Sequence, residues 1–223
     1  MPEKLIEIVR REGVGHVEAY FSPGAYSGQW FEIFAGGGDR VETRERITVD
    51  DLYAVEALNV QVPFAVGKEL IDGQLGREVS ACLREIPTDV ELGTRGAGEL
   101  VADGGHADQA WLLLNDPSEK TGIGWVIAGK LMARKRPRLI PVYDSVVRCQ
   151  FGAPKQVWLK LHDQLAENDG ELRAALAEVR ATTGVDDKMS ILRVLDIVLW
   201  RRHVKEHLRN QPTTCPQRHC VAL

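Results

Sequence analysis

Apolar side chains recur at helical spacing along most of this chain. In the segment 190–208, one face of a helix would carry Ile191, Leu195, Val198 and Leu199. Alternation typical of a strand is limited to the short run RLIPVY at 138–143. The pattern therefore predicts a mostly α protein, a helical bundle rather than an array of strands and helices.

Residues that start and stop helices divide this pattern into segments. Thr48 is a candidate N-cap with Asp51 three residues later, and Pro63 stands near the end of the same segment. We expect helices over residues 48–62, 64–71, 74–86, 107–116, 125–135, 145–152, 154–168, 170–184 and 190–208.

Composition varies along the chain and predicts its organisation. Residues 1–47 are rich in glycine and aromatic residues and are expected to be irregular, with Trp30 and its neighbours packed as a loop on the helices. An α-helical domain is expected over 48–209. The glycine-rich stretch 88–105 is expected to be a long loop that divides this domain into two lobes. Residues 210–223 are expected to form a flexible tail.

Composition also limits the classes of function. The 223 residues are 44% hydrophobic and 27% charged, which is typical of a soluble globular protein. No apolar run approaches the length of a membrane span, and the N-terminus does not resemble a signal peptide. We therefore expect a cytoplasmic protein without a membrane partner. The pattern predicts no oligomeric state.

Neither the cysteines nor the histidines predict a metal site or another cofactor. The four cysteines contain no CxxC pair, and the tail residues Cys215, His219 and Cys220 lack a second half-site. His203 and His207 are four residues apart, but they stand among charged residues and are expected to be a solvated helix end.

Positive charge is concentrated in one segment. Residues 120–160 contain nine Lys or Arg and one acid, a charge of +8, in a chain whose net charge is -4. Two glycines before a helix favour a tight hairpin whose free N–H groups can bind an anion. The alternative is a solvated face without a ligand. The residues expected to contact phosphate are Gly122, Gly124, Lys130, Arg134, Lys135, Arg136 and Arg138.

The same segment resembles a known motif. The run GIGWVIAGKL at 122–131 is similar to the helix-hairpin-helix of DNA-binding proteins, and Asp144 follows Gly124 by 20 residues after a proline-containing segment. This spacing resembles the helix-hairpin-helix-Gly-Pro-Asp superfamily of DNA glycosylases, the relatives of endonuclease III. Residues 25–205 also resemble an uncharacterised bacterial family, through SGQWFE, GGGDR, KRPRLIPVYDS and LRVLDIVLW.

The glycosylase resemblance implies a DNA-glycosylase-like fold and an N-glycosidic hydrolase with DNA as partner. Asp144 would be the catalytic carboxylate, and Trp125, Tyr143 and Trp30 would surround the base. Glycosylases that also cleave the strand carry a lysine two residues after the second hairpin glycine. Because Val126 stands there, the resemblance implies a monofunctional enzyme without lyase activity. The four-cysteine iron–sulfur cluster of endonuclease III is absent.

Alternative interpretations of these residues remain open. Asp144 could be only a helix N-cap. Asp196 interrupts an apolar run and is either a second catalytic carboxylate or a structural ion-pair partner of Arg148 or Arg193. Two further hypotheses therefore stand beside the glycosylase: a non-catalytic module that binds DNA or a nucleotide, and the same scaffold adapted to a small nucleotide or another anionic metabolite.

Overall fold

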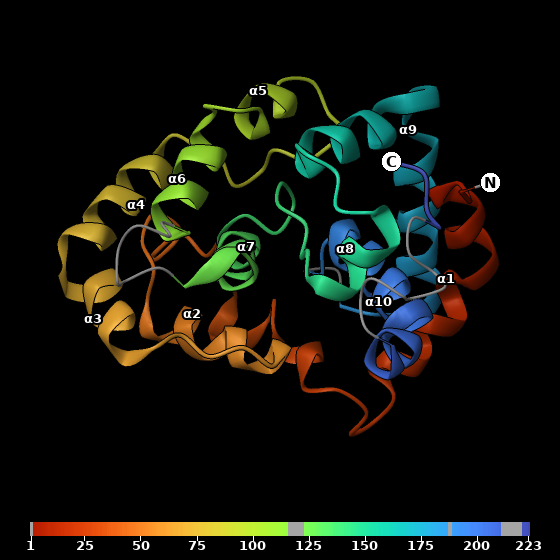
Figure 1. Ribbon diagram of the computed structural model, residues 1–223, viewed down its shortest axis with the longest axis horizontal. Helices are drawn as coiled ribbons and strands as arrows, with labels where there is room; N and C mark the ends of the chain where they lie inside the picture. The colour runs from red at the N-terminus through yellow and green to blue at the C-terminus, as the bar shows by residue number, and fades with distance from the viewer. Residues whose placement is uncertain (1, 116–122, 187–188, 211–219) are drawn as a thin grey trace.

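The computed structural model describes residues 2–115, 123–186, 189–210 and 220–223, and this part of the chain is mostly helical with no strand (Figure 1). The mostly α class is therefore confirmed. Short 3-10 helices lie at Ser27–Trp30, Phe34–Gly36 and Val55–Leu58. The α-helices are α1 Leu5–Phe21, α2 Val49–Ala54, α3 Phe64–Asp72, α4 Gln74–Arg84, α5 Ala97–Val101, α6 His106–Leu114, α7 Gly124–Lys135, α8 Ser145–Phe151, α9 Val157–Thr183 and α10 Ile191–Arg209.

The helices form two packed groups. A terminal group contains α1, α8, α9 and α10, and an internal group contains α2 to α7 (Figure 1). Helix α1 packs on α9 and α10, so the start of the chain is covered by its end. Helix α7 lies in the middle of the molecule in Figure 1, and the chain passes directly from it into α8 of the terminal group.

Local capping fixes several helix boundaries. Thr48 and Asp51 form the predicted capping box: the Thr48 N–H donates to Asp51 Oδ2 over 2.9 Å, and Asp51 N–H donates to Thr48 Oγ1 over 3.4 Å. The helix expected over 48–62 ends early, because Asn59 adopts a left-handed conformation with φ 57°. Helix α9 contains the expected break near residue 169, where Asn168, Asp169 and Gly170 all have positive φ.

The expectation that residues 1–47 are irregular is wrong for their first half, which forms α1. Its buried residues Leu5, Ile8 and Val9 begin a helical stripe that Val17 continues. Of the two glycines that weaken this pattern, Gly13 has a packing role. A Cβ added to Gly13 would lie 2.8 Å from Val179 Cγ2, so glycine at this position allows α1 to approach α9 closely.

Two other expectations about the domain are corrected. The stretch 88–105 contains helix α5 and does not divide the domain, because the flanking helices α4 and α6 pack directly on each other. The last residues of the tail, 220–223, are anchored: Val221 is buried, and its N–H donates to Gln150 O over 3.2 Å. Glu3 forms an isolated parallel bridge with Val221. No described helix combines the length and apolar character that a membrane crossing requires.

Candidate functional site

The cations of α7, and Arg136 directly after it, lie inside the protein. Arg134, Lys135 and Arg136 are at most 1% exposed. Arg134 donates from Nη1 to Phe31 O over 2.6 Å and to Glu32 O over 2.7 Å. Burial lowers the pKa of all three cations, and that of Arg136 falls to about 10. The cations therefore support the loop between α1 and α2, which we call the N-terminal loop, by donating hydrogen bonds to its backbone carbonyl groups.

A buried carboxylate balances part of this charge. Asp51 Oδ1 accepts from Arg134 Nε over 3.2 Å, and Asp51 Oδ2 accepts from Lys135 Nζ over 3.1 Å. Lys135 also donates to Thr43 O over 2.8 Å, and Arg136 donates to Ile86 O over 2.6 Å. These bonds join α7 to the loop between α1 and α2 and to the end of α4.

The predicted phosphate-binding surface is therefore wrong for Arg134, Lys135 and Arg136. Their N–H groups bond to the protein itself and do not face solvent. Arg138 is exposed, and Gly124, also exposed, begins α7 with φ 69°. Gly122 lies outside the described residues.

Lys130, the remaining cation of this set, lines a pocket of about 380 Å³ that also contains Asp144. Lys130 Nζ donates to Leu58 O over 2.9 Å. Burial lowers the pKa of Lys130, while the charges of Asp144 and Asp196 act to raise it. The Asp144 pocket, as we name it, is lined by residues that include Tyr20, Tyr26, Gly28, Asn59, Val126, Lys130, Asp144, Arg193, Asp196 and Trp200.

Two backbone N–H groups hold the side chain of Asp144, which lines this pocket. Its Oδ1 accepts hydrogen bonds from Val146 N over 2.9 Å and from Val147 N over 3.1 Å. These bonds make Asp144 the N-cap of α8, which confirms the predicted position at a helix start. Asp144 therefore has one oxygen engaged in the cap and a fixed position beside Lys130.

Asp196 enters the same pocket from α10. It is 4% exposed and pairs with Arg193, which is one of the two predicted partners. Burial raises the pKa of Asp196 to about 7, although the Arg193 charge acts in the opposite direction. Arg193 also donates from Nη2 to Tyr20 Oη over 2.7 Å. The structure therefore brings Asp144 and Asp196 to one pocket, and it shows the ion pair that was one of the two interpretations of Asp196.

Aromatic rings also line the Asp144 pocket: Tyr26, which the sequence offered beside Trp30 as a stacking platform for a base, and Tyr20 and Trp200, which it did not indicate. Tyr20 and Tyr26 stack with ring centroids 4.8 Å apart, and Trp200 meets Tyr26 edge-on at 5.5 Å. Trp200 follows Asp196 by four residues on α10, so helical spacing places both on one face. This i, i+4 relationship is the signal that could have identified Trp200.

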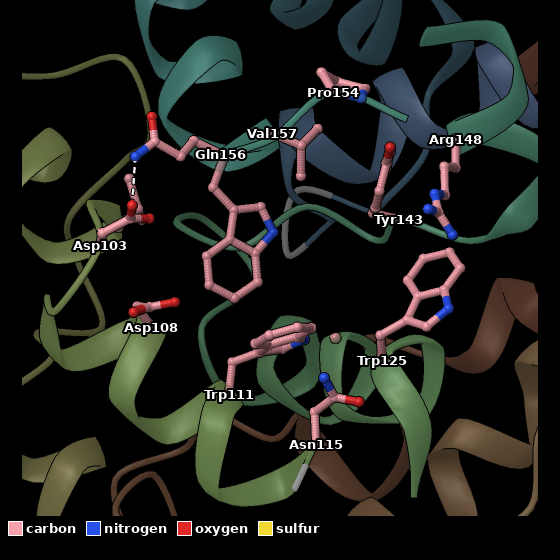
Figure 2. Close-up of a pocket in the computed structure, with 13 residues that line it drawn as sticks. Asp103, Asp108, Trp111, Asn115, Trp125, Tyr143, Arg148, Pro154, Gln156 and Val157 are labelled. Carbon is pink, nitrogen blue, oxygen red and sulfur yellow. Dashed lines mark hydrogen bonds between the residues drawn. The ribbon is translucent and has the colours of Figure 1, made fainter. Parts of the chain in front are cut away.

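Trp125 and Tyr143, two predicted base-pocket residues, line a different pocket of about 470 Å³ (Figure 2). We name it the tryptophan pocket, because Trp111 and Trp158 also line it, with ring centroids 6.3 Å apart. The Arg148 guanidinium lies 5.0 Å from the centroid of the Trp125 ring. The third predicted residue, Trp30, is 56% exposed and lines neither pocket.

Helix α7 and the segment after it contribute to both pockets. Gly129 lines the tryptophan pocket, and its neighbour Lys130 lines the Asp144 pocket. After α7, Tyr143 lines the tryptophan pocket, whereas the next residue, Asp144, lines the other pocket. Adjacent side chains point in different directions on a helix and to opposite sides of an extended segment, so residues close in sequence reach different sites. The sequence alone therefore could not show that Trp125 and Tyr143 line a different pocket from Asp144.

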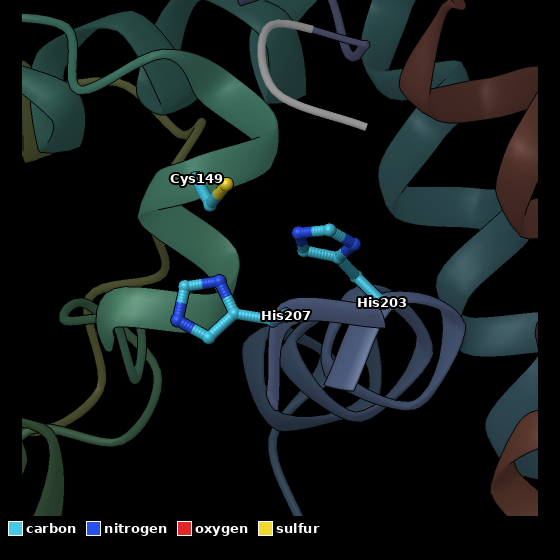
Figure 3. Close-up of side chains that lie close together, drawn as sticks. All are labelled: Cys149, His203 and His207. Atoms are coloured by element: carbon cyan, nitrogen blue, oxygen red, sulfur yellow. The ribbon is translucent and has the colours of Figure 1, made fainter. Parts of the chain in front are cut away.

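Within the residues that the structure describes, a cluster of metal-ligand residues lies in the terminal group. Cys149 of α8 and His203 and His207 of α10 offer ligand atoms that all lie within 4.8 Å of one another (Figure 3). His203 is 0% exposed, so the expectation that this pair is a solvated helix end is wrong. Cys215 and His219 lie outside the described residues.

Comparison with known families assigns the chain to one of them. The model of a family described as "Family of unknown function (DUF6308)" matches residues 13–203. The chain belongs to this family. The DUF6308 match includes Asp144, Asp196 and His203 and confirms the expected membership of an uncharacterised family. Neither a curated protein nor a solved structure matches the chain.

Proposed function

We propose that this protein is a monofunctional N-glycosidic hydrolase that acts in the Asp144 pocket. The observation that carries the proposal is the convergence of Asp144, Asp196 and Val126 on one pocket. Val126 stands where the strand-cleaving glycosylases that this segment resembles carry their lysine. Its position beside Asp144 supports a glycosylase-like site without lyase chemistry.

The two carboxylates suit different steps of such a hydrolysis. Asp144, fixed through Oδ1, would stabilise the positive charge that develops on the sugar and orient the attacking water. Burial raises the pKa of Asp196 to about 7 despite its ion pair with Arg193, so Asp196 is the candidate donor of a proton to the leaving base. Carboxylates with such different environments are typical of acid–base pairs.

The pocket has the size and walls that a single base requires. Its volume of about 380 Å³ falls within the range of roughly 300–1,000 Å³ typical of small-molecule sites. Tyr20, Tyr26 and Trp200 give the pocket the aromatic lining that favours a base. Water, a sugar and one base are therefore the expected occupants.

The buried cations bear on the size of the substrate. Duplex DNA is normally bound through many contacts between cations and phosphates. Arg134, Lys135 and Arg136 are buried and cannot supply them. This observation favours a second candidate, in which the same glycosidic bond is cleaved in a free nucleoside or nucleotide.

The test measures base release from two substrate panels. Purified protein is incubated with duplexes that contain modified bases and, separately, with free nucleosides and nucleotides, and released bases are measured by mass spectrometry. We expect release from one panel, and we expect Asp144→Asn to lower the rate by about 100-fold or more. Release at the wild-type rate by the mutant, or no release from either panel, would contradict the proposal.

A binding measurement on the same two proteins separates hydrolysis from binding alone. Binding of an oligonucleotide or nucleotide is measured by fluorescence anisotropy for the wild type and for Asp144→Asn. A hydrolase should lose base release while it keeps its affinity. Binding without any base release would instead support a non-catalytic module.

A further inference from the structure

Helices α8 and α10 bring a thiol and two imidazoles together. Cys149 lies on α8, and His203 and His207 are four residues apart on one face of α10. Figure 3 shows both rings extending from α10 towards the Cys149 side chain. Cys149 and His203 are buried, and His207 is half-buried.

We propose that Cys149, His203 and His207 form a binding site for a divalent metal ion of the zinc class. A thiolate with two imidazoles is a donor set that zinc prefers, whereas magnesium and calcium prefer oxygen. A zinc site with three protein ligands takes water or another group as its fourth ligand. None of these three residues lines the Asp144 pocket, so metal binding can be tested without the proposed function.

The distances fit this assignment. Zinc holds nitrogen at about 2.0–2.1 Å and sulfur at about 2.3 Å, so tetrahedral ligand atoms lie roughly 3.3–3.7 Å apart. The three ligand atoms already lie within 4.8 Å of one another. Side-chain rotations that bring the ligand atoms about 1 Å closer to one another would therefore complete the tetrahedral geometry without movement of either helix.

A second observation points to a ligand at the same place. The Nδ1 atom of His207 is buried and has no hydrogen-bond partner among the described residues. Buried polar atoms are normally paired, and each exception requires an explanation. A metal ion bound by this imidazole would satisfy the nitrogen.

The metal would join two elements that carry the candidate catalytic carboxylates. Helix α8 begins immediately after its N-cap Asp144, and α10 carries Asp196. A bond from Cys149 to the histidines through a metal would fix α8 against α10. The proposed role is therefore structural: the ion holds the two sides of the Asp144 pocket in register.

The test measures metal content in the full-length protein. Wild-type protein and the variants Cys149→Ser, His207→Ala and Cys82→Ser are loaded with zinc under reducing conditions, passed through gel filtration and analysed by mass spectrometry. We expect about one tightly held zinc per chain in the wild type. Cys149→Ser and His207→Ala should retain at least about tenfold less, and the Cys82→Ser control, on the remote helix α4, should match the wild type.

Cobalt provides an independent measurement. Cobalt bound by a thiolate gives a sulfur-to-metal charge-transfer absorption, which should be present in the wild type and in Cys82→Ser and absent in Cys149→Ser. Circular dichroism checks that each variant is folded, and if Cys149→Ser fails to fold, His207→Ala decides the question. No metal retained by the wild type, or wild-type metal content in folded His207→Ala, would overturn the proposal.

Discussion

Arg134 and Asp51 form an ion pair inside the protein, with 3.2 Å between Nε and Oδ1 and at most 1% of either side chain exposed. Lys135 shares the same carboxylate. Because Asp51 also belongs to the capping box of α2, one side chain connects α2, α7 and the cations that hold the N-terminal loop. The fold in this region depends on that single acid.

Replacing Asp51 with Asn should therefore be strongly destabilising. The change leaves two buried cations without their carboxylate, and breaking a buried pair in this way costs about 3–5 kcal/mol. The control is Asp50→Asn, which removes a partly exposed pair with Arg40 and should cost at most about 1 kcal/mol. Urea unfolding measures both, and equal losses would show that the Asp51 pair adds little.

Two substitutions at Asp144 should separate its capping role from its proposed chemistry. Asn is about as good an N-cap as Asp, so Asp144→Asn should change the free energy of unfolding by only a few tenths of a kcal/mol, whereas Asp144→Ala should cost about 1 kcal/mol. Base release should be lost in both. Thermal unfolding and the release assay are compared on the same preparations. Loss of activity in Asp144→Ala alone would leave Asp144 as a cap only.

Glu32 should make stability depend on pH. It is buried and accepts hydrogen bonds from Ser190 N and Ser190 Oγ, both over 2.8 Å. Burial raises the pKa of Glu32 from 4.5 to about 7. The folded state therefore binds the proton more tightly, so this contribution is fully present below about pH 4.5 and is lost as pH rises to about 7.

The variant Glu32→Gln isolates this effect, because it stays neutral at every pH. The stability of the wild type relative to Glu32→Gln should fall between pH 4.5 and pH 7, by up to about 3 kcal/mol. Urea unfolding across this range provides the measurement. A constant difference would show that Glu32 titrates at its ordinary pKa in the folded protein.

Two glycines should respond to alanine in opposite directions. A Cβ at Gly38 would lie 2.3 Å from Arg134 O and 2.9 Å from Asp51 Oδ1, so Gly38→Ala should cost about 1–3 kcal/mol. Gly15 lies exposed within α1 with no atom near an added Cβ. Gly15→Ala should therefore stabilise the protein by about 0.5–1 kcal/mol. Thermal unfolding distinguishes the two results, and destabilisation by both would contradict this interpretation.

Features that depend on local sequence were predictable. The capping box at Thr48, the position of Asp144 before α8 and the extent of α10 all follow from residues within one or two turns. Helix α1 was missed because Gly13 and Gly15 weaken its helical pattern. The requirement for Gly13 comes from Val179 on α9, which is distant in sequence.

Features that depend on tertiary contacts were not predictable in the same way. The sequence predicts the cations of α7 at the surface. Nothing in their own segment indicates that Arg134 donates to Phe31 O and Lys135 to Thr43 O inside the protein. The metal-ligand cluster was predictable only in part, because the sequence shows the spacing of His203 and His207 but not the residue that faces them. The position of Cys149 against them depends on the packing of α8 on α10.

Burial of the α7 cations also changes what other molecules encounter. Formal counting gives a net charge of -4 and an isoelectric point near 5.9. The buried charged side chains of the described residues are the cations Lys130, Arg134, Lys135, Arg136 and Arg193 and the acids Glu32, Asp51 and Asp196, so more positive than negative charge is withdrawn from the surface. The exterior is therefore more acidic than the composition indicates. Long polyanions approaching the molecule would be repelled more strongly than its formal charge implies, whereas a small solute would cross this field at little electrostatic cost.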